Sequence, residues 1–415
     1  MRNKIIKFIL FCCISLVLLP FASTSTIAWA ATENETNKEY RDEVISQIQL
    51  EPSINQAVGT KYQPILQNNE LEAGTYSLNW ISSKPKVAKI TAKDGVISAL
   101  TEGKTIITCI LTVGEKQYKY SSQLTVTNPK FDQKVYYVAT KSKIRLPITG
   151  TSTTDIMCQS SNDKVALPAD EGTTVTGKSA GTVYITAEVD RRYITCKVIV
   201  SSPKLNYTDL FLESGKKATI KVTGHSKTTP ITFTSSDKKI ATVSSSGSVK
   251  AVKQGSTVIT VTVDQKVYSC YVGIGKTEVV TSMTRAYEAL GCTYSQANRM
   301  KEGYYDCSSL IWRSFSPAGY YFGDKKYAPT AASQAQSLVK EKKAIAYKGL
   351  ELSGLLPGDI LYMNSTVKNG RYKNISHVAI YIGNGRILHA RDEKGGVCID
   401  SYDSYKKRVV VVARL

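Results

Sequence analysis

The sequence predicts a multidomain fold in which three all-β sandwiches precede one α+β domain. One motif occurs three times at intervals of about 75 residues, and each copy leads into a glycine turn and a run of alternating β-branched residues. That interval is too long for a solenoid repeat and suits small independent domains. After Lys276 the pattern changes, because helical spacing appears first and short strands follow. Helices followed by antiparallel strands are typical of an α+β domain.

The N-terminus predicts a cleaved export signal over residues 1–30. Basic residues precede an apolar run from Phe8 to Ala22, and Ala28–Ala30 offers a small-residue cleavage site. A membrane anchor is the alternative, but the run is short for a bilayer span. We therefore expect a secreted protein without a transmembrane anchor, in which residues 31–46 form a linker.

The charge of the chain bears on its partners. Its 54 basic residues exceed its 34 acidic ones, and the net charge is +20. In an exported protein this excess argues against nucleic acid and favours anionic surfaces such as wall polymers. A generic lysine-rich surface explains the same excess, so charge alone identifies no partner.

The cysteine count allows disulfides and leaves one thiol over. The chain holds nine cysteines, and two of them lie in the predicted signal. Seven then remain, so one thiol stays free if the others pair, and Cys307 is the natural candidate for it. Cys158 and Cys196 lie in strand-like runs of one predicted domain. A disulfide between them is one expectation, and it would stabilise the fold by about 4 kcal/mol.

The three repeats predict sandwich domains over residues 47–127, 128–202 and 203–275. Each copy contains a Ser-Ser pair followed by a Val-Ala or Ile-Ala pair. These segments are 82–88, 160–166 and 235–241. Apolar residues alternate with polar ones between turn residues, which is typical of antiparallel sheet. About eight short strands in each unit imply a sandwich.

The repeats resemble the group 2 bacterial immunoglobulin-like domains. Trp80–Ala88 and Gly95–Gly103 carry the match in the first copy, and Ser235–Gly255 carries it in the third. The second copy departs at Leu167–Ala169, where a smooth strand is expected. Nothing in the repeats indicates catalysis, and we expect their single histidine, His225, in an exposed loop. The resemblance implies spacers or adhesive modules.

Residues 277–415 predict an α+β domain with its own core. Helices are expected over Thr281–Leu290 with Ser282 as N-cap, from Cys307 onward, and over Ala331–Lys340. The expected strands cover 360–363, 377–382, 386–390, 397–400 and 408–413. A segment of this length is sufficient for an independent hydrophobic core.

One cysteine and two histidines supply the groups that a thiol nucleophile needs. Asp306 is a good N-cap for a helix that begins at Cys307, and a helix N-terminus favours a thiolate. A half-buried structural cysteine is the alternative. His377 opens an alternating strand, and His389 follows the turn at 383–385. A three-residue loop places both rings on one sheet face, whereas a two-residue loop places them on opposite faces. On a shared face His377 can act as base and His389 can orient it.

Residues 285–413 resemble the NlpC family of papain-fold cell-wall peptidases. The matching segments are 290–294, 305–310, 356–360, 376–385 and 387–390. The resemblance implies a papain-like fold for this domain. It also implies Cys307 as nucleophile, His377 as general base and His389 as the third member of the site.

The same resemblance implies residues that bind the substrate. Tyr294 and the backbone around the cysteine are expected to stabilise the oxyanion, while Asp306 and Ser308 are expected to hold the polar end of the acceptor peptide. Two features depart from the family pattern. Ser309 replaces the usual glycine after Cys-Ser, and the segment 295–303 is longer and more basic than usual.

These features predict a secreted, wall-associated peptidoglycan endopeptidase that acts on stem peptides. The resemblance implies cleavage between the D-γ-glutamyl residue and the diamino acid. An amidase or acyltransferase that uses the same Cys-His pair is an alternative, as is a surface adhesin with a vestigial catalytic domain. We expect no cofactor. We also expect no metal, because no further ligand stands at a suitable spacing from His377 and His389.

Overall fold

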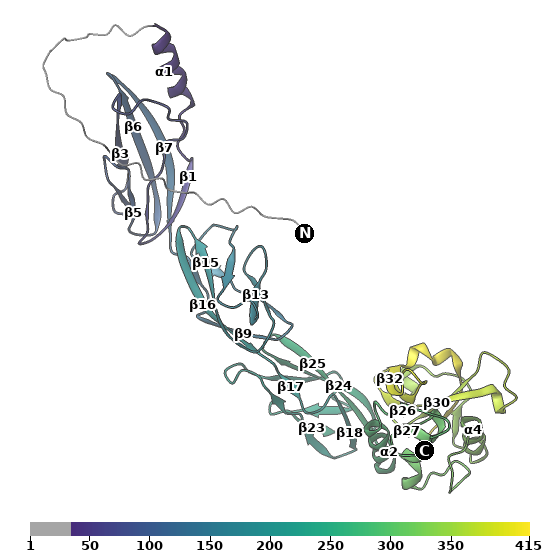
Figure 1. The fold of residues 1–415 in the computed structure, drawn as a ribbon. Helices are drawn as coiled ribbons and strands as arrows, with labels where there is room; N and C mark the ends of the chain where they lie inside the picture. The colour runs from purple at the N-terminus through teal and green to yellow at the C-terminus, as the bar shows by residue number, and fades with distance from the viewer. Residues whose placement is uncertain (1–34) are drawn as a thin grey trace, which may run out of the picture.

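The computed structural model describes residues 35–415, so the signal predicted at 1–30 lies outside the described part. Three β units follow one another end to end, and a mixed domain stands at the C-terminal end of the row (Figure 1). The described chain is therefore an extended rod with the mixed domain at one tip. Within residues 35–415, no helix has the length and apolar character needed to cross a bilayer.

The segment expected as a linker is helical over most of its length. Helix α1 spans Glu35–Gln47, which overlaps the range 31–46. Val44 and Ile45 are buried, and Ile45 and Ile48 belong to the hydrophobic core of the first β unit. A helix that buries one apolar face against a sandwich is part of that domain. The linker prediction is therefore wrong for these residues.

The three β units share one sheet plan, in which a four-stranded sheet faces a three-stranded one. The four-stranded sheets have the orders β1-β7-β6-β3, β12-β15-β16-β9 and β18-β25-β24-β21, and the three-stranded sheets have the orders β2-β5-β4, β10-β14-β13 and β19-β23-β22. In each unit an early strand (β1, β9 or β18) pairs in parallel with the last one. Side chains between the two sheets form a separate core in each unit.

The strands of the first unit are β1 Ser53–Ala57, β2 Lys61–Tyr62, β3 Tyr76–Ser82, β4 Ala88–Ile90, β5 Ile97–Ala99, β6 Gly103–Val113 and β7 Lys116–Thr127. Those of the second are β8 Lys130–Phe131, β9 Val135–Ala139, β10 Lys143–Arg145, β11 Ile148–Thr149, β12 Cys158–Ser160, β13 Ala166–Pro168, β14 Thr174–Gly177, β15 Gly181–Val189 and β16 Arg192–Ser201. Those of the third are β17 Lys204–Leu205, β18 Asp209–Glu213, β19 Lys217–Thr219, β20 Val222–Thr223, β21 Thr232–Ser235, β22 Ala241–Val243, β23 Ser248–Ala251, β24 Gly255–Val263 and β25 Lys266–Gly275.

The disulfide considered between Cys158 and Cys196 does not form, and both are buried free thiols. Cys158 lies on β12 and Cys196 on β16, and both strands flank β15. Strands two places apart in a sheet are separated by about 9–10 Å. A disulfide requires Cα atoms within about 7 Å, so the bridge is out of reach.

A hairpin turn of the second β unit contacts the first unit, and a hairpin turn of the third unit contacts the second. Asp190 and Asp264 begin two such turns with the same left-handed backbone, φ 49°. Their carbonyl oxygens accept hydrogen bonds from Ala57 N and Ala139 N of the preceding unit, each at 2.7 Å. The donors to the Asp190 carboxylate are the hydroxyls of Thr127, Thr151 and Thr153, and those to the Asp264 carboxylate are the Ser201 and Thr229 hydroxyls and Ser226 N. Each joint is therefore built around one buried, fully satisfied aspartate.

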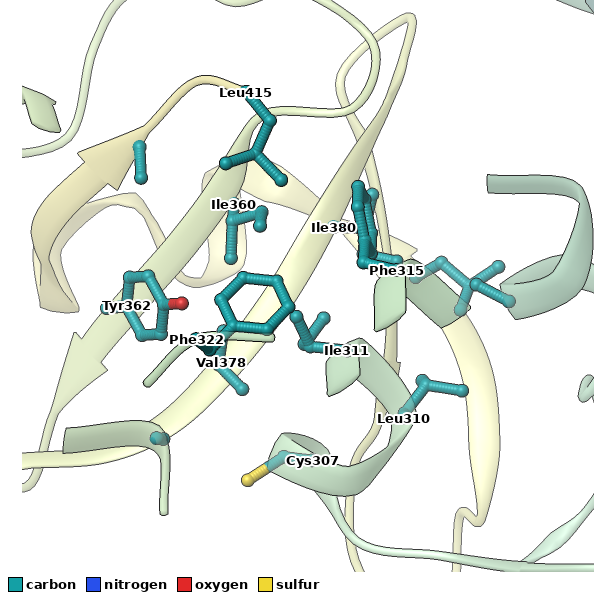
Figure 2. Close-up of a cluster of buried hydrophobic side chains, with 14 of the residues drawn as sticks. Cys307, Leu310, Ile311, Phe315, Phe322, Ile360, Tyr362, Val378, Ile380 and Leu415 are labelled. Atoms are coloured by element: carbon teal, nitrogen blue, oxygen red, sulfur yellow. The ribbon is translucent and has the colours of Figure 1, made fainter. Parts of the chain in front are cut away.

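The mixed domain packs helices on a six-stranded antiparallel sheet of order β28-β33-β29-β30-β31-β32. Its helices are α2 Thr277–Glu288, α3 Cys307–Phe315 and α4 Ala331–Lys340, with short 3₁₀ turns at Ser316–Ala318, Leu352–Gly354, Tyr372–Asn374, Tyr402–Ser404 and Lys406–Arg408. Its strands are β26 Thr293–Tyr294, β27 Tyr304–Tyr305, β28 Ala344–Ala346, β29 Ile360–Asn364, β30 Ile375–Gly383, β31 Arg386–Ala390, β32 Val397–Ser401 and β33 Val409–Ala413. Figure 2 shows α3 side chains such as Ile311 and Phe315 against Val378 and Ile380 of β30.

The first helix of the mixed domain begins earlier than its sequence pattern indicates. Helix α2 follows β25 almost directly, starts at Thr277 and has no side-chain cap. Ser282 is buried inside it and donates to the Glu278 carbonyl at 2.7 Å, so it is not the N-cap. The predictions for α3 and α4 are confirmed, because α3 begins at Cys307 and α4 spans Ala331–Lys340.

The third β unit supports the hairpin of β30 and β31. Asn384 at the hairpin turn donates its backbone N–H to Ser256 Oγ at 3.0 Å. Arg386 forms an ion pair with Asp209 at 2.5 Å and stacks on the Tyr271 ring. Since this hairpin carries both His377 and His389, the last β unit holds the far end of the element that bears the two histidines.

Candidate active site

The local sequence around Cys307 builds a capped helix start. Asp306 Oδ1 accepts from Ser309 N at 2.7 Å, and Asp306 N donates to Ser309 Oγ at 2.9 Å. These reciprocal bonds form a capping box, so the serine that replaces the usual glycine helps to close the helix end. The Cys307 sulfur lies at the edge of the apolar cluster, 4.0 Å from the carbonyl oxygen of Ser376 (Figure 2).

Burial outweighs the lowering effect of the helix N-terminus on the pKa of the Cys307 thiol, so the thiolate is not the resting form that the sequence pattern favours. The residue is only 7% exposed. Burial, together with the negative charge of Asp306, raises the pKa of Cys307 to about 12. Backbone N–H groups of Val378 and Ser308 lower the pKa of Cys307 but do not offset the burial. The resting thiol is therefore protonated.

The register of the β30–β31 hairpin places both histidines on one face. The turn itself has two residues, Asn384 and Gly385, because Gly383 pairs with Arg386. A bulge at Ile382 then shifts the register, so that Ile380 pairs with Leu388. This is the register expected for a three-residue loop, reached by a two-residue turn and a bulge. The prediction of a shared face is confirmed, whereas its proposed cause is wrong.

The two imidazoles and one carboxylate form a continuous hydrogen-bonded row. His377 Nε2 lies 2.8 Å from His389 Nδ1, and His389 Nε2 lies 3.1 Å from Asp400 Oδ2. Asp400 also accepts from the Tyr405 hydroxyl at 2.9 Å. Sequence reasoning missed Asp400. Cys398 pairs with His389 across β31 and β32. Asp400 lies two residues after Cys398 on β32, so its side chain is on the same sheet face as Cys398 and His389.

Both histidines are neutral at neutral pH. Burial, together with the neighbouring His389, lowers the pKa of His377 to about 3. Burial also lowers the pKa of His389, although the Asp400 carboxylate opposes that effect. For Asp400, burial pushes the pKa upward, but hydrogen bonds from Tyr405 and His389 outweigh it and leave the pKa below its ordinary value. The row at rest thus consists of two neutral rings and one carboxylate.

The residues expected to bind the substrate have partners within the chain. Arg299 Nη1 lies 2.7 Å from Asp306 Oδ2 and 3.2 Å from Ser308 Oγ. The other carboxylate oxygen of Asp306 accepts the hydrogen bond of the helix cap. Asp306 and Ser308 are therefore both bonded to groups of the chain itself. Tyr294 is half-buried beside this region and accepts from Gln296 Nε2 at 3.2 Å. Burial raises the pKa of Tyr294, so its hydroxyl keeps the proton it can donate.

The structure also places two further side chains that can bind a metal ion, those of Cys398 and Asp400, beside His389. The ligand atoms of His389, Cys398 and Asp400 lie within 4.8 Å of one another, although the sequence suggested no set of metal ligands. Arg391 Nη1 lies 3.5 Å from Asp400 Oδ2. A guanidinium at that distance disfavours a second cation. His225, the third histidine, is half-buried and far from this site in sequence, and its Nδ1 contacts the Ser226 carbonyl.

Comparison with known families divides the chain in the same way. Residues 287–414 match the model of the NlpC/P60 family, and residues 199–272 match that of the bacterial Ig-like domain (group 2). The chain therefore carries an NlpC/P60 domain at its C-terminus and a group 2 Ig-like domain upstream of it.

Similar individual proteins cover parts of the chain. The bifunctional muramidase/DL-endopeptidase CwlT of Bacillus subtilis (strain 168) is 32% identical over 114 residues, which is 27% of this chain and 29% of CwlT. The crystal structure of the NlpC/p60 domain of the peptidoglycan hydrolase SagA is 19% identical and covers 33% of this chain and 98% of its own, with a TM-score of 0.25. A titin fragment is 14% identical and covers 55% of this chain and 97% of its own, with a TM-score of 0.21.

Proposed function

We propose that the C-terminal domain is a cysteine peptidase that cleaves stem peptides of peptidoglycan. The observation that carries this proposal is the thiol of Cys307 beside strand β30, which presents His377 paired with His389 at 2.8 Å. The family match over residues 287–414 supports the reaction class. The similarity to CwlT, a DL-endopeptidase, supports cleavage of the bond between the D-γ-glutamyl residue and the diamino acid.

In the proposed reaction the Cys307 sulfur attacks the scissile carbonyl carbon while its proton passes to His377. Because thiol and imidazole are both neutral at rest, the proton moves with the attack and not before it. Backbone N–H groups at the start of α3 and the Tyr294 hydroxyl are the donors available to the oxyanion. Collapse of the tetrahedral intermediate breaks the C–N bond, and the leaving amine takes the proton from His377.

The second half of the reaction restores the enzyme. The acyl group remains on Cys307 as a thioester. His377 accepts a proton from water as the water oxygen attacks the thioester carbonyl. As the C–S bond breaks, His377 returns its proton to the sulfur, and the new carboxylic acid then loses its own proton to solvent.

The β units extend this proposal to targeting. The third unit overlaps the group 2 Ig-like match, and the first two share its sheet plan, which supports an Ig-like assignment for all three. The full sequence carries a net charge of +20, of which only three positive charges lie in the predicted signal, so such units can tether the secreted peptidase to anionic wall polymers.

Mass spectrometry of muropeptides tests the function. Purified peptidoglycan is digested with the chain lacking residues 1–30, in parallel with Cys307→Ala. We expect disaccharides with stems cut after the D-glutamyl residue, and none from the variant. Whole stems released from the sugar indicate an amidase, and new peptide linkages indicate an acyltransferase. Unchanged muropeptides contradict the proposal.

A further inference from the structure

A carboxylate lies at the end of the histidine row opposite the thiol. Asp400 is on β32, and its Oδ2 lies 3.1 Å from Nε2 of His389, a side chain that is fully buried. Tyr405 donates its hydroxyl to the same oxygen, and its ring lies edge-on to His389 at 5.1 Å between centroids. Asp400 is thus held in place by its own partners, and it meets the one nitrogen of His389 that does not face His377.

The proton position on His389 follows from that contact. An ionised carboxylate can only accept hydrogen bonds, so Nε2 of His389 must carry a hydrogen and donate it to Asp400. In a neutral imidazole the other nitrogen has no hydrogen. Nδ1 of His389 is therefore an acceptor.

The proton position on His377 follows from that of His389. Nδ1 of His389 lies 2.8 Å from Nε2 of His377, so Nε2 of His377 must be the donor in this bond. Nδ1 of His377 is then unprotonated. Within residues 35–415, this nitrogen has no hydrogen-bond partner, which leaves its lone pair available to the thiol proton.

We propose that Asp400 is a positioning residue that sets the tautomers of both histidines and keeps Nδ1 of His377 as the free base. The direction of every bond in the row stays the same when Nδ1 takes the proton from Cys307, because the two Nε2–H groups continue to donate. Proton transfer therefore needs no rearrangement. The catalytic consequence rests on the proposed peptidase function, whereas the tautomers themselves do not.

Nitrogen-15 NMR of the imidazoles reads the tautomers directly. The chain has three histidines, and His225 serves as an internal reference. We expect both His377 and His389 as Nε2–H tautomers in the wild type at neutral pH. In Asp400→Leu, which removes the acceptor, we expect His389 to populate the Nδ1–H form. Asp400→Asn keeps an acceptor oxygen and should hold the wild-type tautomers more fully.

The rate at which Cys307 is alkylated in the absence of substrate tests whether the tautomers affect its reactivity. Alkylation of Cys307 by iodoacetamide, followed by mass spectrometry of its peptide, should slow about tenfold or more in Asp400→Leu. Asp392→Asn is the matched control, because Asp392 is an exposed neighbouring carboxylate that pairs with Arg391 and has no hydrogen bond to His389. For peptide turnover, we expect kcat to fall in Asp400→Leu with KM nearly unchanged.

Two results overturn the proposal. One is an Nδ1–H tautomer of His377 in the wild type, which can be seen even if Asp400→Leu does not fold. The other is an Asp400→Leu protein with wild-type tautomers and alkylation rate. If the wild type shows the expected tautomers but leaves peptidoglycan uncut, the proposed function fails and the positioning role stands.

Discussion

The joints of the rod and the histidine row of the mixed domain both bury titratable side chains, but they satisfy them differently. Asp190 and Asp264 are 8% and 3% exposed, and each carboxylate has donors for both oxygens. In the row, His389 is satisfied on both nitrogens, but His377 uses only one. The Cys307 thiol meets backbone groups, which are the Ser376 carbonyl oxygen at 4.0 Å and the N–H groups of Val378 and Ser308. A buried group whose hydrogen bonds are all made stabilises the structure, whereas a buried group with one atom unpaired is able to react.

Removing the unpaired Nδ1 of His377 should have the largest effect on activity. In His377→Ala the thiol has no base, so we expect kcat/KM for a soluble stem peptide to fall about 10²- to 10⁴-fold. His225→Ala, in the third β unit, is the control and should retain wild-type activity. Circular dichroism checks that both variants fold. Activity of His377→Ala within tenfold of the wild type argues against the general-base role.

The second ring should matter less, because it orients the base and does not take the thiol proton in our scheme. His389→Ala should lose about 10- to 100-fold in kcat. His389→Gln can retain one hydrogen bond to His377 and should keep more activity than the alanine variant. A peptide assay of the two variants side by side measures the difference. If His389→Ala equals the wild type, the residue has no part in the reaction.

Loss of the Asp190 carboxylate, whose hydrogen bonds are all made, should lower stability and leave activity unchanged. Asp190→Ala leaves three hydroxyl donors without their acceptor and should lower the stability of the joint by about 1–3 kcal/mol. Turnover of a soluble peptide should not change, since the site lies two units away. Asp163→Ala, an exposed position in the same unit, is the control for thermal unfolding. Equal melting of the two variants shows that the joint is not held by Asp190.

Acid should weaken the mixed domain through its histidines. Their pKa values are lowered by burial in the fold, to about 3 for His377, and return to near 6.5 on unfolding. Between those values the unfolded chain binds more protons, so stability falls as the pH falls. Each histidine contributes at most about 1.4 kcal/mol per pH unit. Thermal unfolding between pH 7 and 5 should show a shallower slope in His377→Gln, and an unchanged slope contradicts the assigned shift.

Wall binding should show the smallest and least specific effect. If the basic β units tether the protein, binding to purified sacculi should weaken as salt is added, because exposed charges more than about 10 Å apart are screened at 0.1 M. Turnover of a soluble peptide serves as the control and should depend much less on salt. Binding that is constant across the salt series removes the electrostatic tether from the account.

Local patterns in the sequence predicted the elements that carry the site. An aspartate before Cys307 gave a capped helix at the expected residue, and alternation gave β30 and β31. The shared face of His377 and His389 was also predicted, but through a loop length that the structure does not have. The bulge at Ile382 has no sequence signal as strong as a glycine turn, since it depends on how neighbouring strands pair.

Features that depend on the assembled fold were not predictable in this way. The pKa of Cys307 is governed by burial among elements distant in sequence, which outweighs the helix terminus. Arg299 meets Asp306 only once the segment 295–303 has folded back over α3. Asp400 joins the row because β32 pairs with β31 in a particular register. Each case needs the three-dimensional arrangement and not the local pattern.

Cleavage of one defined peptide is the sharpest test of Cys307 as the nucleophile of a stem-peptide endopeptidase. A stem peptide that contains the D-γ-glutamyl–diamino acid bond is incubated with the wild type, with Cys307→Ala and with Cys292→Ser, a half-buried cysteine of the same domain outside the row. We predict that the wild type and Cys292→Ser give the two fragments of that bond, whereas Cys307→Ala gives none. Cleavage by Cys307→Ala within tenfold of the wild-type rate, or an intact peptide with all three proteins, contradicts the account.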